Sequence, residues 1–108
     1  MITAVPWQIN DLENKEFVKS ANQIWGEQIL ITWRTATAFD ATKTVAIAME
    51  KNGNTRIGIQ QALSHNFAFS GVTGTIKFLS WGDHISKAVL VQVQPDTQAL
   101  TGYNFVRK

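Results

Sequence analysis

The apolar residues of this chain change their spacing after Leu63, and that change limits the folds open to it. Before Leu63 they recur at intervals of three and four residues, which is typical of helices with one buried face. After Leu63, glycines divide the sequence into short segments in which apolar and polar residues partly alternate, as they do in strands. The sequence therefore predicts an α/β protein with about three helices followed by an antiparallel strand pair.

Three segments have helical spacing. The first covers residues 12–25 and ends at Gly26, the second covers residues 35–51, and the third is a shorter helix capped by Asn54 or Thr55. The residues expected to face the core are Phe17, Val18, Ala21, Ile24 and Trp25 in the first helix, Phe39, Thr42, Val45, Ala46 and Met49 in the second, and Ile57, Ala62 and Leu63 in the third.

Two strands are expected over residues 75–79 and 88–94. The intervening residues 80–84 contain glycine and aspartate, which favour a turn between antiparallel neighbours. Residues 2–7 indicate a short extended segment that ends near Pro6, and residues 100–106 indicate either a further edge strand or a frayed end.

Length and composition exclude several classes of protein. The 108 residues fit one domain of ordinary size or a piece of something larger, but not two domains. The absence of cysteine excludes disulfide scaffolds, thiolate nucleophiles and cysteine-based metal sites. No apolar run approaches the roughly 20 residues of a membrane-spanning helix, and the first residues lack the features of a signal peptide, so we expect neither in this chain.

No catalytic pattern is present. The sequence has no Gly-x-Ser-x-Gly or His-Glu-x-x-His motif, and Gly71-Val72-Thr73-Gly74 lacks the lysine of a phosphate-binding loop. The only histidines, His65 and His84, are too far apart in sequence to favour a metal site. We therefore expect no enzymatic activity, no metal and no cofactor.

The basic residues do not indicate a nucleic-acid partner. Ten Lys and Arg against eight Asp and Glu leave a net charge of only +2, and the cations are spread along the chain with acids between them. Aromatic and basic residues do not interleave as in a surface that stacks bases. We expect the aromatic residues to pack in the core, and no interaction with nucleic acid.

Three groups of residues resemble a known family. They are Ala4-Val5-Pro6-Trp7; the segment from Trp33 to Thr42, which contains Phe39-Asp40-Ala41; and the segment from Phe69 to Phe78, which is followed by Gly82-Asp83 and by Val89-Leu90-Val91-Gln92-Val93. Their order and spacing look like the C-terminal third of a type 1 periplasmic solute-binding protein, of the branched-chain amino acid transporter or receptor ligand-binding family. The resemblance covers nearly the whole chain.

The resemblance implies a partial lobe of the type 1 periplasmic-binding-protein fold. Residues 1–108 would then be a single incomplete domain, in the periplasm or outside the cell, that binds a small solute such as an amino acid. Membrane transporter subunits would be partners only through a full-length parent protein. Because the final strand pair lacks a partner sheet in this chain, we expect a homodimer or higher assembly. The alternative is an oligomerising or partner-binding module that keeps the lobe fold without a functional cleft.

The resemblance also implies a ligand contact at Arg34, with Trp33 beside it. An arginine at the start of a helix holds a carboxylate through two charge-assisted hydrogen bonds, and the first-turn amides add partial positive charge. The family's aromatic residue at this point contacts an aliphatic side chain, so Arg34 favours a more polar or acidic solute. The alternative is that Arg34 is solvated and its aliphatic stem covers Trp33.

Asp40 is the third candidate ligand-binding residue. In the first turn of a helix its carboxylate would orient Arg34 or a ligand amine. The alternative is that it stabilises the positive helix end and pairs with Lys43. Phe39 stands where the family more commonly has tyrosine, and the missing hydroxyl favours a packing role for that position.

Overall fold

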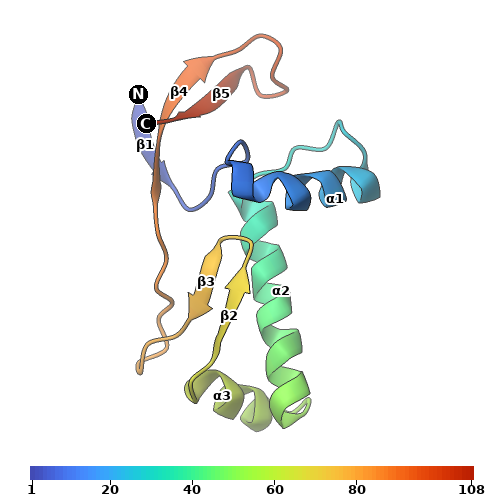
Figure 1. Cartoon of the computed structure of the whole chain (residues 1–108), viewed down its shortest axis with the longest axis vertical. Helices are drawn as coiled ribbons and strands as arrows, with labels where there is room; N and C mark the ends of the chain where they lie inside the picture. The colour runs from blue at the N-terminus through green and yellow to red at the C-terminus, as the bar shows by residue number, and fades with distance from the viewer. The chain divides into compact units, whose positions relative to one another are not determined.

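The computed structural model describes all 108 residues and contains three α-helices and two antiparallel sheets. The expected mixture of helices and strands is confirmed in this general form (Figure 1). The chain divides into two compact units. Unit 1 consists of Met1–Thr35 and Ala88–Lys108, and unit 2 consists of Ala36–Lys87. None of the helices combines the length and the apolar character needed to cross a membrane.

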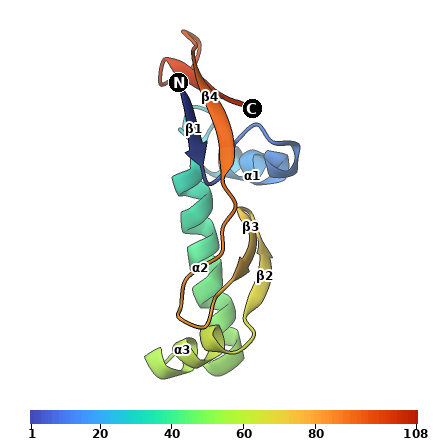
Figure 2. The same cartoon turned by 90° about the vertical axis from the view of Figure 1, so that its left-hand side faces the viewer.

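Unit 1 is built around a three-stranded sheet with the order β1-β4-β5. In it, Ile2 lies opposite Gln92, and Val91, which is fully buried, lies opposite Arg107. Figure 2 shows β1 alongside β4. The elements of unit 1 are β1 (Ile2–Val5), the 3-10 helix η1 (Leu12–Asn14), α1 (Lys15–Trp25), the first residues of α2 (Trp33–Asn52), β4 (Val89–Pro95) and β5 (Tyr103–Arg107).

Aromatic packing connects α1 with the segment after β1. The ring of Trp7 is buried and meets the ring of Phe17 edge-on, with 5.9 Å between the ring centroids. The helix ends where expected, because Gly26 has a φ of 88° and its N–H donates to the carbonyl of Asn22. The buried residues of unit 1 include Trp7 and Ala21 near the start of the chain and Val91 near its end.

Unit 2 contains the rest of α2, α3 (Arg56–Ser64) and a hairpin of β2 (Ala68–Gly71) and β3 (Gly74–Lys77). Thr55 caps α3 as expected, since its hydroxyl oxygen accepts a hydrogen bond from the N–H of Gly58 at 3.0 Å. Val72 and Thr73 form the hairpin turn, and Gly74 follows with a φ of 116°, which glycine adopts without strain. The core of unit 2 is the cluster Ala48, Ala62, Phe67 and Ile76.

The expected strand pairing is wrong. Residues 74–77 pair with Ala68–Gly71, a strand that the sequence did not predict, and β4 pairs with β1 and β5 instead of β3. The predicted turn does form, because the N–H of Leu79 donates to the carbonyl of Asp83 at 2.8 Å. The two segments that flank this turn pair only through an isolated bridge between Phe78 and His84. Alternation identifies a strand, but it does not identify the partner.

The predicted buried face of α2 is also wrong. Phe39 is 47% exposed, and the other four residues of that face are exposed as well. The residues that are buried follow one another at intervals of four: Ala36, Asp40, Thr44 and Ala48. Small side chains allow close packing along this row, and hydrogen bonds satisfy the carboxylate within it.

The faces of the other two helices are predicted in part. In α1, Ala21 is buried and Phe17 and Val18 are half-buried, but Ile24 and Trp25 are exposed. In α3, Ala62 is buried and Leu63 is half-buried, whereas Ile57 is exposed. The exposed residues Ile24, Trp25 and Ile57 lie at the ends of their helices, where fewer neighbouring elements cover the side chains.

Candidate functional site

The first turn of α2 is held by two threonines. The N–H of Thr32 donates to the hydroxyl oxygen of Thr35 at 3.1 Å, and the N–H of Arg34 donates to the hydroxyl oxygen of Thr32 at 3.2 Å. This reciprocal arrangement is similar to a capping box, with threonine in place of the usual glutamate or glutamine. It orients the helix start on which two of the predicted ligand-binding residues lie.

The structure brings Trp33 and Arg34 together. The guanidinium carbon of Arg34 lies 4.7 Å from the centroid of the Trp33 ring, within the range of a cation–π contact. Arg34 is exposed and Trp33 is half-buried. The guanidinium itself, and not only its aliphatic stem, therefore lies over the ring. A guanidinium held in this way keeps its planar fork in a defined orientation.

Asp40 lies in the interior of α2 and not in its first turn, because the helix begins at Trp33. The side chain is buried at 3% exposure, and its two oxygens accept three hydrogen bonds. One oxygen accepts from the N–H of Val72 at 2.8 Å, and the other accepts from the N–H and the hydroxyl of Thr73 at 2.8 and 2.6 Å. The carboxylate thus fastens the turn of the β2–β3 hairpin to α2.

The expected contacts of Asp40 with the helix end and with Lys43 are not formed. The Lys43 ammonium lies 5.9 Å from the centroid of the Phe69 ring. Gly71 approaches the carboxylate so closely that a Cβ at this position would stand 2.7 to 2.8 Å from its atoms. The aspartate of the helix and the glycine before the turn are therefore parts of one structural contact.

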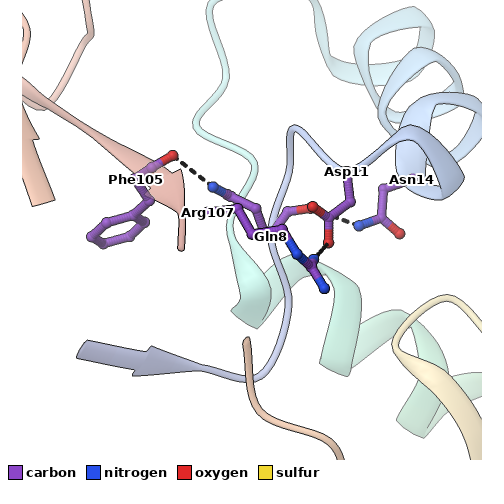
Figure 3. A network of polar contacts seen from close by, with 5 residues as sticks. All are labelled: Gln8, Asp11, Asn14, Phe105 and Arg107. Carbon is purple, nitrogen blue, oxygen red and sulfur yellow. Dashed lines mark hydrogen bonds and ion pairs between the residues drawn. The ribbon is translucent and has the colours of Figure 1, made fainter. Parts of the chain in front are cut away.

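A buried polar network in unit 1 was not predicted (Figure 3). The amide nitrogen of Gln8 donates to the carbonyl of Phe105 at 2.6 Å, and the amide nitrogen of Asn14 donates to the carbonyl of Gln8 at 2.6 Å. Arg107 pairs with Asp11 beside them. The polar character of residues 8–10 indicated a loop, and Asn14 was expected in the first helix without a role. No sequence signal identified a partner of Gln8 that lies 97 residues away.

The two histidines serve local contacts. The Nδ1 of His65 donates to the carbonyl of Gln61 at 2.7 Å, and the ring of His84 lies 6.2 Å from that of Phe78. Nowhere do three His, Cys, Asp or Glu side chains lie in positions to hold a metal ion together. The polar side chains described above therefore act through hydrogen bonds and charge.

No protein-family model matches the chain, and no curated protein matches it significantly. Its function is therefore inferred from its own residues. Of the predicted ligand-binding residues, the exposed Arg34 lies on the Trp33 ring and Asp40 contacts the hairpin turn.

Proposed function

We propose that this chain is the C-terminal part of a solute-binding lobe of the type 1 periplasmic-binding-protein kind. In this proposal the first turn of α2 contacts a small polar or acidic solute, such as an amino acid. The observation that carries it is the exposed guanidinium of Arg34, which lies 4.7 Å from the Trp33 ring at the start of a 20-residue helix.

The contacts between the motifs support this proposal. The first motif contributes β1, which pairs with β4 in the last motif through Ala4 opposite Leu90 and Val5 opposite Val89. Asp40 of the second motif binds Val72 and Thr73 of the third. The residues that carry the resemblance therefore contact one another in two pairs, as expected if they are the framework of a common architecture.

The proposed role of the site is recognition without chemical change. Arg34 supplies a fixed positive charge and a planar set of donors, which suit a carboxylate. Trp33 orients the guanidinium and contributes apolar surface for the rest of the solute. Asp40 acts indirectly, by holding the hairpin against α2. The proposal includes a periplasmic or extracellular location, and it treats the chain as an incomplete domain. Transporter subunits would contact it only as part of a longer parent protein.

Native mass spectrometry, before and after addition of a mixed amino-acid pool, tests this function. We expect a bound solute mass on the unaltered chain. Arg34→Gln should weaken binding by about tenfold or more, because a charge-assisted hydrogen bond is lost. Lys87→Gln is the control, since it removes an exposed cation that lies outside the first turn of α2. Unchanged binding in Arg34→Gln would contradict the proposed role of Arg34.

The alternative function is an oligomerising or partner-binding module. Two observations favour it. The sheet of unit 1 ends in two edge strands, β1 and β5, whose outer sides have no partner strand. In unit 2, Phe39, Val45 and Met49 are exposed at helical spacing on α2. An oligomer that ignores the amino-acid pool would support this function, and a monomer that binds no solute would contradict both functions.

A further inference from the structure

Unit 2 contains a surface hollow of about 640 Å³ that is lined by α3, by the end of β3 and by the residues that follow each of them. Its apolar part includes Leu63, Phe67 and Phe78. Phe67 is buried to 2% exposure, and its ring centroid lies 5.9 Å from that of Phe78, with the rings tilted by 45°. The volume falls within the range of roughly 300 to 1,000 Å³ that is typical of sites for small molecules.

The charged side chains of the hollow are both cations. Arg56 lies in the first turn of α3 and Lys77 is the last residue of β3, and both are exposed. No aspartate or glutamate lines the hollow. Asp83 follows the lining residue Gly82, but its carboxylate accepts a hydrogen bond from the indole N–H of Trp81 at 2.8 Å. Two positive charges therefore stand beside an aromatic and aliphatic surface without an acid among them.

We propose that this hollow binds a small organic anion. Its carboxylate pairs with Arg56 and Lys77, and its aromatic or aliphatic body packs against the half-buried side chains of Leu63 and Phe78. Charge complementarity favours an anion, because two cations and no carboxylate line the hollow. The size selects a small molecule over a protein surface, which would need a far larger contact area.

The fold is required to form this site. Arg56 and Lys77 are distant in the sequence, and the packing of Leu63 and Phe78 against the core cluster of unit 2 brings α3 and β3 to one hollow. The hollow shares no residue with the first turn of α2. The proposal is therefore independent of the function proposed above, and either can fail without the other.

The ligand class is tested with 1-naphthylacetate, an aromatic carboxylate, titrated into the full ¹⁵N-labelled chain while amide shifts are recorded. The control is 1-naphthylacetamide, which has nearly the same shape and no charge. We expect the acid to bind with a dissociation constant on the order of 1 mM, given its size. The largest shifts should fall at residues 59–67 and 77–82, and the amide should bind about threefold more weakly or worse.

The two cations are tested with Arg56→Gln and Lys77→Gln. Each should raise the dissociation constant of 1-naphthylacetate about threefold to fivefold, as expected for a partly solvated ion pair. Lys87→Gln removes an exposed lysine of unit 2 that does not line the hollow. It should leave the dissociation constant unchanged.

Three results would overturn the proposal: no shifts up to about 10 mM ligand, well above the dissociation constant expected for a ligand of this size; equal binding of the acid and the amide; or shifts centred outside the hollow. The comparison of acid and amide uses the unaltered chain, so it decides the question even where a variant folds poorly. An unchanged dissociation constant in both Arg56→Gln and Lys77→Gln would also overturn it.

Discussion

The two units of this chain are assembled differently. Unit 2 is one continuous segment, and its hairpin joins neighbours across the two-residue turn of Val72 and Thr73. Unit 1 joins the two ends of the chain, and its sheet places Ile2 opposite Gln92. Closing a long loop costs more conformational entropy than closing a short one, and long-range contacts form more slowly. Unit 2 can therefore form from local contacts, whereas unit 1 needs both ends of the chain.

The units also differ in the polar group that fastens each of them. In unit 2 a buried carboxylate, Asp40, accepts three hydrogen bonds. In unit 1 the buried groups are neutral amides, and that of Gln8 donates one hydrogen bond to Phe105. Hydrogen bonds to charged groups contribute more to stability than those between neutral groups. The loss of a single polar side chain should therefore affect unit 2 more than unit 1.

Asp40→Ala should have the largest effect. It removes the acceptor of the N–H groups of Val72 and Thr73, and we expect a loss of about 3 kcal/mol in the free energy of unfolding. Urea denaturation measures the loss, and amide hydrogen exchange assigns it to a unit, which matters because two units can unfold separately. Amide exchange should accelerate more in β2 and β3 than in β4 and β5. Asp40→Asn keeps the shape of the side chain and should lower the free energy of unfolding by less. A loss below about 1 kcal/mol in Asp40→Ala would contradict the proposed difference between the units.

Gly58→Ala should have the second-largest effect on the free energy of unfolding. It should destabilise the protein, although replacing a helical glycine with alanine usually stabilises it. Alanine normally stabilises an open helical position by about 1 kcal/mol relative to glycine. Here a Cβ would stand 2.3 Å from the carbonyl oxygen of Asn52, so we expect a loss of about 2 kcal/mol from overpacking. Gln61→Ala, at an exposed position of the same helix, should change stability by less than about 0.5 kcal/mol. A stabilised Gly58→Ala chain would show that α3 is less tightly fixed to the end of α2.

Gln8→Ala tests the fastening of unit 1. The carbonyl of Phe105 loses a donor, and we expect a loss of about 1.5 kcal/mol. Amide exchange should accelerate in β5 and leave β2 and β3 unchanged. Gln98→Ala, at an exposed glutamine of unit 1, is the control and should have little effect. If Gln8→Ala instead loosened the hairpin of unit 2, the two units would not be independent in stability.

Arg107→Ala should have the smallest effect. The arginine side chain is 57% exposed, although its partner Asp11 is only 15% exposed. Exposed ion pairs contribute between about 0.2 and 1 kcal/mol, so we expect a loss near the middle of that range. Because salt screens such pairs, the difference from the unaltered chain should shrink at high ionic strength. A larger loss that salt does not reduce would show that the network around Gln8 depends on this pair.

The candidate site was predictable only where neighbours in sequence are neighbours in space. Trp33 and Arg34 were predicted as adjacent residues at a helix start, and they contact each other. The role of Asp40 was not predicted, because its partners are 32 and 33 residues away and a charged residue is not expected inside a core. The Gln8 contact and the hollow beside α3 were not predicted either, because they too join residues that are distant in the sequence.

The sequence by itself determined the approximate positions of the three helices, the glycine end of α1 and the location of β4. These features depend on periodicity and on residues a few positions apart. The sequence left open whether Asn54 or Thr55 caps α3 and whether the residues of β5 form a strand or fray. Only the tertiary structure decided which strands pair and which face of α2 is buried. Those choices depend on the balance of contacts between distant segments: α2 buries a row of small residues and Asp40, whose carboxylate is satisfied there, and leaves Phe39, Val45 and Met49 exposed.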